Sequence, residues 1–334
     1  MSPTKFPGGP VVNPENAARF SEMWGHPVPA EPGLDTGAMM DAAHAGATDV
    51  LYNIGGNLYA TMPDPDFMKQ AFKNIRLRIH QDINLNTSTL IEPGEAILLL
   101  PAQTRYEQRG GGTSTSTERR IRFSPEIPGH PTVGETKPEY EIPALVACAA
   151  RPELSDALKF ASSQAIRDEI GEVMPVYKGI ERLSKEGDWI QWGGPHLGAG
   201  GVFPAMPDQR AQFIGLVPPK TELEPGLFFL SNRRGKQFNS MVFAAEDTLQ
   251  GGLGRSDVFV NQADADQLGV RDGSAIRLHN DYGEMDGIVR IENIKEGNLQ
   301  AYWPEANPLV PRVYDPVSRE PDYNAQVRVE VISR

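Results

Sequence analysis

The sequence predicts an α/β fold in two parts: a domain with a parallel sheet, followed by a β-barrel or sandwich of about six strands. In the first part, short apolar runs alternate with helical periodicity up to residue 174, which is typical of parallel strands joined by crossover helices. From residue 227 onward, short alternating runs are separated by turn signals such as Asp272-Gly273. We therefore expect an α/β domain over residues 1–190, a linker over 191–225 and the barrel over 226–334.

The α/β part begins with elements in the order expected of a parallel sheet. Asp64 is placed to cap a helix that runs to Ile75, because apolar residues recur behind it at helical spacing. Two helices separated near Arg151-Pro152 account for the apolar pattern of residues 140–174. The other elements expected in this part are a helix over 35–44 and strands over 48–56, 77–83 and 95–100.

The barrel part consists of short strands and one short helix. Asn261 is a suitable cap for a helix over 263–268, and Gly269 is a suitable residue to end it. Between residues 189 and 225, glycine clusters and prolines indicate a long connection instead. The expected strands are 227–230, 257–260, 275–279, 287–291, 298–302 and 326–331.

Composition places the chain among globular proteins and excludes several functions. Of its 334 residues, 39% are hydrophobic and 23% are charged, which is ordinary for a soluble protein. The net charge of −12 argues against a duplex-binding surface, because such surfaces are basic. No apolar run reaches 18 residues and no targeting pattern opens the chain, so we expect a cytoplasmic protein without a membrane span.

Catalytic motifs are scarce in this sequence. One thiol, Cys148, can form neither an internal disulfide nor a cysteine-ligated iron–sulfur cluster by itself. The six histidines lack metal-ligand spacing, and no P-loop, HExxH motif or serine nucleophile elbow is present. We therefore expect no catalytic residue and no metal ligand, but a protein that binds a group which performs the chemistry.

Residues 228–240 form the segment richest in ligand-binding chemistry. Behind an apolar run stand the paired guanidinium groups of Arg233 and Arg234, which suit bidentate contacts to phosphate. Gln237 and Asn239 add carboxamides that can read the edge of a heterocycle, and Gly235 lets the backbone approach closely. A flat, polyanionic ligand fits this combination, and a solvated turn is the alternative.

Polar residues also follow two expected strands of the parallel sheet. Gly55-Gly56-Asn57 ends the first strand and Gln81-Asp82 ends the second, at the sheet edge where ligands bind in open α/β folds. A tight turn explains the glycines equally well. In the barrel part, Asn307 lies between two prolines that stiffen it, which suits a reader of a ring edge or an ordinary turn. The tract Gly110 to Arg120 reads as a flexible surface loop or as an anion-binding loop.

In order and spacing, these motifs resemble the C-terminal half of the molybdopterin oxidoreductases, the formate dehydrogenase and nitrate reductase group that carries a bis-(molybdopterin guanine dinucleotide) cofactor. The formate dehydrogenase-like subgroup is the most similar. The resemblance covers the chain from about residue 46 to its end. Its motifs are Tyr52 to Asn57, Gln81-Asp82, Leu100 to Ala102, Thr117 to Arg120, Arg233 to Asn239, Asn261 to Ala265, Leu268 to Gly273 and Pro304 to Asn307.

The resemblance implies a six-stranded double-psi β-barrel and molybdopterin guanine dinucleotide, with its molybdenum, as cofactor. In the barrel, the residues implied to line the pterin and phosphate path are Arg233, Arg234, Gln237, Asn239 and Asn307. In the sheet, the residues implied to face the guanine dinucleotide of one cofactor half are Gly56, Asn57, Gln81 and Asp82.

The family's iron–sulfur cysteines and its molybdenum ligand have no counterpart in this chain. The resemblance therefore implies the cofactor-binding C-terminal portion of a molybdenum-dependent oxidoreductase, inactive by itself, whose missing N-terminal part or partner subunit carries those groups. The alternative is a noncatalytic cofactor-binding or interaction subunit, or an inactive remnant. The substrate, the electron acceptor and the choice between molybdenum and tungsten stay open.

Overall fold

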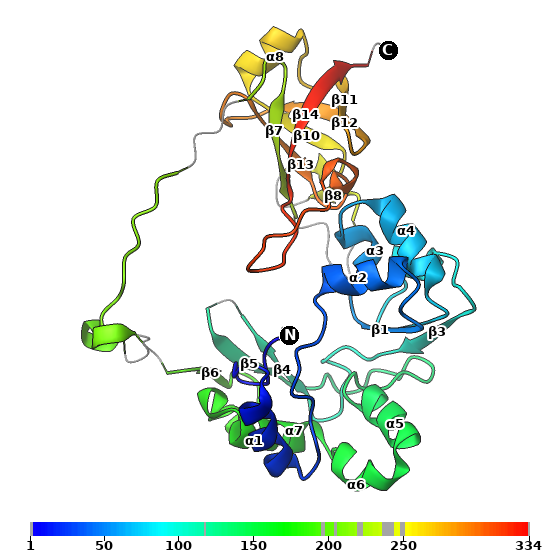
Figure 1. Cartoon of the computed structure of the whole chain (residues 1–334), viewed down its shortest axis with the longest axis vertical. Coiled ribbons are helices and arrows are strands. Elements are labelled where there is room, and N and C mark those ends of the chain that lie inside the picture. The colour runs from blue at the N-terminus through cyan, green and yellow to red at the C-terminus, as the bar shows by residue number, and fades with distance from the viewer. Residues whose placement is uncertain are drawn as a thin grey trace. The chain divides into compact units, whose positions relative to one another are not determined.

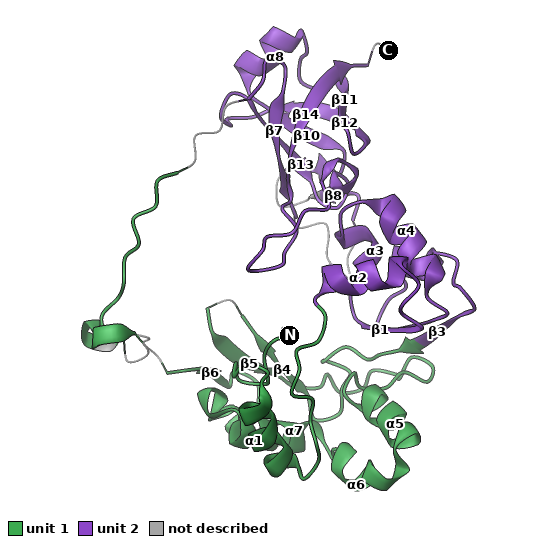
Figure 2. Ribbon diagram, in the orientation of Figure 1, with its two compact units in different colours: residues 1–34, 100–219 green, residues 35–99, 220–334 purple. Residues whose placement is uncertain are grey.

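The computed structural model describes residues 3–116, 118–194, 198–203, 206–218, 223–235, 244–247 and 251–332. Contacts divide the chain into two compact units, each built from two stretches of sequence (Figure 2). Unit 1 holds residues 1–34 and 100–219, and unit 2 holds residues 35–99 and 220–334. The expected domain borders near residues 190 and 225 stay a prediction.

Unit 2 contains a three-stranded sheet in the order β1-β2-β3, in which β1 and β2 run parallel. Figure 1 labels β1 and β3 of this sheet near the helices α2, α3 and α4. Helix residues such as Met40, Met68 and Phe72 are less than 2% exposed and form one core with the apolar side chain of Leu51. The strands are β1 Val50–Ile54, β2 Leu77–Asp82 and β3 Ala96–Pro101, and the helices are α2 Thr36–His44, α3 Leu58–Thr61, α4 Pro65–Asn74 and the 3-10 turn Thr87–Leu90.

Helix α4 forms where the sequence pattern predicts it. The carboxylate of Asp64 accepts a hydrogen bond from the backbone N–H of Phe67 at 3.1 Å, which satisfies a donor that the first helical turn leaves unpaired. The buried residues Met68, Ala71 and Phe72 repeat at three- and one-residue steps along one face. Asp35 caps α2 in the same way, through the N–H of Ala38.

The second part of unit 2 is a closed six-stranded barrel in the order β10-β12-β11-β14-β7-β13. Two neighbouring pairs, β10 with β12 and β13 with β7, run parallel. The expected six-stranded double-psi barrel after an α/β part is thereby confirmed. Its strands are β7 Phe228–Arg233, β10 Asp257–Val260, β11 Ala275–His279, β12 Glu284–Ile291, β13 Asn298–Tyr302 and β14 Asn324–Val331.

Inward-facing apolar residues of the barrel strands form its core. Leu230, Val258, Ile276 and Leu299 are at most 1% exposed and belong to one cluster. Helix α8, Gln262–Leu268, begins at its cap Asn261 and ends at Gly269 in the left-handed conformation, as predicted. The other short elements are the 3-10 turn Asn307–Leu309 and the hairpin of β8 Glu246–Asp247 with β9 Leu253–Gly254.

Unit 1 packs helices against a small antiparallel sheet in the order β4-β5-β6. Its core holds Ile121, Phe123, Ile180 and Leu183. The strands are β4 Gly112–Thr115, β5 Arg120–Ser124 and β6 Trp189–Gln191. The helices are α1 Pro14–Trp24, α5 Glu141–Ala150, α6 Ser155–Leu158 and α7 Ser163–Val173, with 3-10 turns at Pro152–Leu154, Pro175–Tyr177, Ile180–Arg182, Ala199–Gly201 and Pro207–Gln209.

Two local predictions in unit 1 were wrong, and one helix was not predicted. The tract from Gly110 to Arg120 is not a plain loop, because β4 lies in it and pairs with β5. Helix α1 was not expected, although Asn13 caps it with a hydrogen bond of 2.8 Å to the N–H of Asn16. The predicted helix break near Arg151-Pro152 exists, but the helical segment is interrupted again between α6 and α7.

Among the described residues, no helix is long and apolar enough to cross a bilayer.

Candidate functional site

Parallel pairing of β7 with β13 brings two predicted barrel segments together. Arg233 lies opposite Tyr302 in this pair, and the backbone N–H of Trp303 donates to the carbonyl of Arg233 at 2.7 Å. Because the two strands run in the same direction, the segment after Arg233 and the segment 304–307 leave the barrel at the same end. We call this end the barrel rim, defined by Asn232 to Arg234 and by residues 303–307.

Arg233 is held against aromatic rings at the barrel rim. Its guanidinium carbon lies 5.3 Å from the ring centre of Phe259 and 5.5 Å from that of Tyr302. These distances suit cation–π contacts, which fix the guanidinium plane. The side chain donates one bond, of 3.4 Å, to the amide oxygen of Gln300. Arg234 is exposed beside it, and the predicted residues Gln237 and Asn239 lie outside the described residues.

Two carboxamides at the rim have buried atoms without hydrogen-bond partners. Both amide atoms of Asn232 are buried and unpaired among the described residues, as is the amide oxygen of Asn307. Asn232 was not among the site residues predicted from the sequence. The signal was its register, because Asn232 follows the buried residues Phe228 and Leu230 at two-residue steps and therefore points inward. An unpaired buried amide costs about 1–3 kcal/mol, so a ligand that satisfies it would be favoured.

Asn307 also connects the barrel to the sheet of unit 2. Its side-chain N–H₂ donates to the carbonyls of Ala60 at 2.7 Å and of Met62 at 3.3 Å. Close by, the hydroxyl of Tyr323 donates to the carbonyl of Thr61 at 3.1 Å. These carbonyls belong to the end of α3, the helix that Asn57 begins. The barrel rim is therefore hydrogen-bonded to the end of α3, the helix that follows strand β1 of the sheet.

Asn57 is committed to local structure. Only 8% exposed, its side-chain oxygen accepts from the hydroxyls of Thr87 at 3.0 Å and Ser88 at 2.9 Å, and it caps α3. Gly56, just before it, has φ of 93°, and an added Cβ would meet nothing within 4 Å. The glycine is thus needed for its backbone conformation, and space lies open in front of it.

Gln81 and Asp82 differ in what they offer a ligand. Gln81 is fully buried and accepts a hydrogen bond of 2.6 Å from the hydroxyl of Tyr52. Asp82 is half-buried and accepts bonds from the backbone N–H of Ile83 at 2.8 Å and the amide of Asn86 at 3.2 Å. Of the four predicted sheet residues, Gly56 and Asp82 are therefore the accessible ones, whereas Asn57 and Gln81 hold the strand ends in place.

An ion pair connects the rim residue Glu305 to Arg255, which lies between β9 and β10. Arg255, 9% exposed, donates its Nε–H to the carboxylate of Glu305, and the other oxygen of Glu305 is buried without a hydrogen-bond partner among the described residues. Arg255 was also not predicted as a site residue, because in the sequence it stands alone between Gly254 and Ser256. With Arg233 and Arg234, it gives the barrel end a third guanidinium group.

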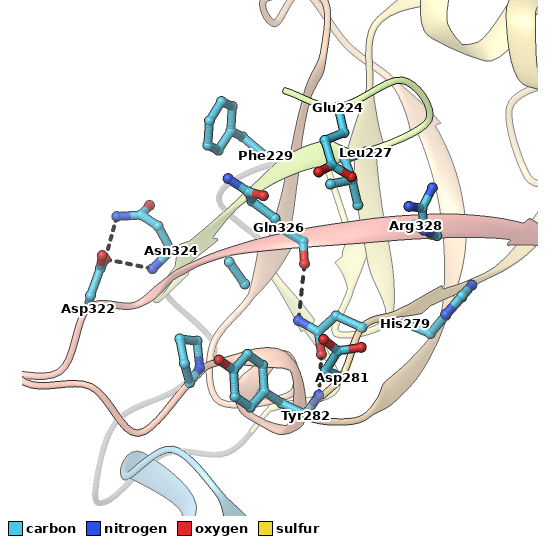
Figure 3. Close-up of a pocket in the computed structure, with 13 residues that line it drawn as sticks. Glu224, Leu227, Phe229, His279, Asp281, Tyr282, Asp322, Asn324, Gln326 and Arg328 are labelled. Atoms are coloured by element: carbon cyan, nitrogen blue, oxygen red, sulfur yellow. Dashed lines mark hydrogen bonds between the residues drawn. The ribbon is translucent and has the colours of Figure 1, made fainter. Parts of the chain in front are cut away.

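The outer surface of the barrel carries a separate cavity of about 630 Å³, and none of the predicted site residues that the structure describes lines it (Figure 3). Three carboxylates, those of Glu224, Asp281 and Asp322, face it against the single guanidinium group of Arg328. A polyanionic ligand would be repelled there. The candidate site for such a ligand is therefore the barrel rim.

Comparison with known proteins identifies the barrel. Residues 227–327 match the molydopterin dinucleotide binding domain. The chain is 26% identical to an uncharacterised oxidoreductase of Mycobacterium bovis, over 88% of this chain and 40% of that protein. It is 27% identical to the F420-dependent formate dehydrogenase 1 subunit alpha of Methanococcus maripaludis, over 96% of this chain and 48% of that protein.

Among solved structures, the fold is similar to that of acetylene hydratase from Pelobacter acetylenicus, with a TM-score of 0.58 and 13% identity over 88% of this chain and 46% of that one. The chain spans less than half the length of each of these three proteins. These matches confirm the resemblance found in the sequence motifs. The chain is thus similar to part of longer oxidoreductases, and its residues 227–327 match the molydopterin dinucleotide binding domain.

Proposed function

We propose that unit 2 is the cofactor-holding part of a molybdenum-dependent, formate dehydrogenase-like oxidoreductase, and that its barrel rim binds molybdopterin guanine dinucleotide. The observation that carries the proposal is that both amide atoms of Asn232 and the amide oxygen of Asn307 are buried without a hydrogen-bond partner among the described residues, at the barrel end that also carries the guanidinium group of Arg233. A pterin offers ring donors and acceptors to such amides, and its phosphates suit arginine. The residues present therefore fit the group.

The bound cofactor would supply the electron-transfer chemistry at its metal, and this chain would supply binding and orientation. Arg233, fixed on Phe259 and Tyr302, loses little further freedom when it binds a phosphate. Arg234, with Gln237 and Asn239, is proposed to extend the same contact surface. The buried amides of Asn232 and Asn307 would orient the ring by donating to it and accepting from it.

On the sheet side, we propose that Gly56 and Asp82 face the nucleotide end of the cofactor. The open space beside Gly56 allows a phosphate or ribose to approach the backbone. Asp82 offers a carboxylate, which suits ribose hydroxyls or the N–H groups of guanine. Asn57 and Gln81 would act by holding these strand ends through the bonds to Ser88 and Tyr52.

The full reaction is proposed to require more protein than this chain. The relatives are more than twice as long, and the chain has a single cysteine. An N-terminal part or a partner subunit would therefore bring the metal ligand and any iron–sulfur cluster. Supplied with cofactor, the purified chain alone is expected to show no formate oxidation, and turnover in a spectrophotometric assay would refute this requirement.

Cofactor retention tests the site itself. In the native complex, Arg233→Gln combined with Arg234→Gln should lower the molybdenum and guanine nucleotide content severalfold, measured by metal analysis and nucleotide chromatography. Arg271→Gln, an exposed arginine after α8, is the matched control and should leave both contents unchanged. Equal cofactor content in the double variant and the control would contradict the proposal.

A second variant separates binding from folding. Asn232→Leu replaces an unsatisfied buried amide by an apolar side chain of similar size, so the cofactor-free chain should be as stable as the parent or more stable. Cofactor retention should nevertheless fall. If Asn232→Leu left retention intact, the amide would have no role in binding.

A further inference from the structure

Unit 1 contains a cavity of about 610 Å³ that the proposed cofactor site does not use. Its walls are residues 103–109, residues 126–138, the start of α5 and residues 159–161. Backbone hydrogen bonds tie the first two walls together, from Gln103 N–H to the carbonyl of Lys137 at 2.8 Å and from Ile127 N–H to that of Tyr106 at 2.8 Å. The cavity is therefore built by the fold itself.

Three carboxylates line this cavity, and those of Glu107 and Glu126 accept hydrogen bonds from the backbone. Glu107 accepts hydrogen bonds from the backbone N–H of Thr104 at 2.9 Å and from its hydroxyl at 2.8 Å, and these bonds lower the pKa of the carboxyl. Glu126 accepts from the N–H of Gly110 at 3.2 Å and lies 3.9 Å from the ring of His130. Glu141 stands in the first turn of α5, where the helix dipole favours a negative charge.

The cations of the same cavity have no such partners. The side chains of Arg109, Lys137 and Lys159 line it, and within the described part of the chain none of them makes a hydrogen bond or an ion pair. Glu107 and Glu126 already accept hydrogen bonds, whereas the three basic side chains keep all their donors available, so an anion that enters the cavity can accept from them.

The remaining walls add an apolar surface and a neutral donor. Leu145 and Phe160 are 41% and 36% exposed, respectively, and lie beside Ala144 and Ala161 in the lining. Burial, with a further contribution from Glu141, raises the pKa of Tyr140, so its hydroxyl stays protonated at neutral pH. Apolar area together with a few converging polar groups is the usual composition of a small-molecule site.

We propose that this cavity binds a small organic anion, a carboxylate or a phosphate monoester that carries an apolar group. Its charged end would lie among Arg109, Lys137 and Lys159, and its apolar end against Leu145 and Phe160. This site lies entirely in unit 1 and does not depend on cofactor binding in unit 2.

Titration of the full chain with benzoate, phenyl phosphate and the neutral analogue benzamide, followed by calorimetry, tests the proposal. At least one of the two anions should bind about tenfold or more tightly than benzamide, because hydrogen bonds to charged groups contribute that much. A preference between benzoate and phenyl phosphate would identify the class of the natural ligand. Equal affinity for benzamide, or no binding of either anion, would overturn the proposal.

Variants then assign the binding to this cavity. Arg109→Gln combined with Lys137→Gln should weaken the preferred anion about tenfold or more. Phe160→Ala should weaken it without removing its advantage over benzamide. Lys69→Gln, an exposed lysine on α4 in unit 2, controls for the change in net charge and should have no effect. Unchanged affinity in the Arg109 and Lys137 variant would place the binding elsewhere and refute the site.

Discussion

The barrel and the three-stranded sheet of unit 2 bury their strands differently. In the closed barrel, inward residues such as Leu230 and Leu299 are at most 1% exposed, and every strand has two neighbours. In the sheet, α2, α3 and α4 contribute to one core on a single face. Large apolar side chains of the strands stay 45–53% exposed, namely Val50, Ile54, Leu98 and Leu99.

The two regions also differ in what they bury. Among the barrel strands, β10 buries the charged residue Asp257 at 2% exposure, whereas β2 buries three polar or charged residues, Arg78, His80 and Gln81, at 3% exposure or less. Arg78 donates hydrogen bonds from its two terminal nitrogens to the carbonyls of Ser88 and Ile91, but its Nε and both ring nitrogens of His80 have no hydrogen-bond partner among the described residues. β2 thus depends more on polar contacts than the barrel strands do, and removal of a partner or a change of pH can disturb such contacts.

The largest expected difference between the two regions is in core packing. Leu230→Ala in the barrel should lower the free energy of unfolding by about 2–5 kcal/mol, because it leaves a cavity in a closed core. Leu98→Ala on the exposed part of the sheet should change it by less than about 0.5 kcal/mol. Both changes in the free energy of unfolding are measured by chemical denaturation, with hydrogen exchange of the barrel amides as the readout. Equal losses would show that β3 is as well buried as the barrel core.

The connection between the two regions should have an intermediate effect. Asn307→Ala removes the bonds to the carbonyls of Ala60 and Met62 and should cost about 1–3 kcal/mol. Hydrogen exchange should then show the sheet opening without the barrel. Asn324→Ala is the matched control, since Asn324 is exposed and, among the described residues, its side-chain amide donates only to Asp322. If the sheet and the barrel still opened together in Asn307→Ala, the hydrogen bonds of Asn307 would not be what couples the two regions.

The smallest expected effect is a pH dependence that belongs to the sheet. Burial, and then the charge of Arg78, lowers the pKa of His80 from its usual value of 6.5. Below that pH, the unfolded chain binds a proton that the folded chain does not, so stability should fall as the pH falls, by at most about 1.4 kcal/mol per pH unit. Above it, the ring is neutral in both states and contributes no pH dependence.

Unfolding at pH 5 and pH 7 measures this effect. His80→Gln should flatten the pH dependence, because it removes the proton-binding ring. The same substitution at His279, half-buried at the end of β11, is the control and should leave the dependence on His80 in place. A pH dependence that survives His80→Gln would have to arise from other groups.

Local patterns predicted most elements, because each depends on residues close together in sequence. The runs chosen for β10, β11 and β13 coincide with the observed strands, and α8 lies between its predicted cap and its terminal glycine. The sheet β4-β5-β6 was missed, since Ser and Thr in β4 hide any apolar alternation and β6 comes from about 70 residues further on.

For the candidate site, the sequence determined which residue types are available to bind a ligand. It placed arginines after one strand, carboxamides between prolines and glycines at a strand end, and each of these follows from local composition. The tertiary structure alone decided which of them come together. Parallel pairing of β7 with β13 puts Arg233 beside the segment of Asn307, and packing on α3 turns Asn57 into a structural cap. Pairings across tens of residues depend on the register and packing of the whole unit, which no short stretch of sequence specifies.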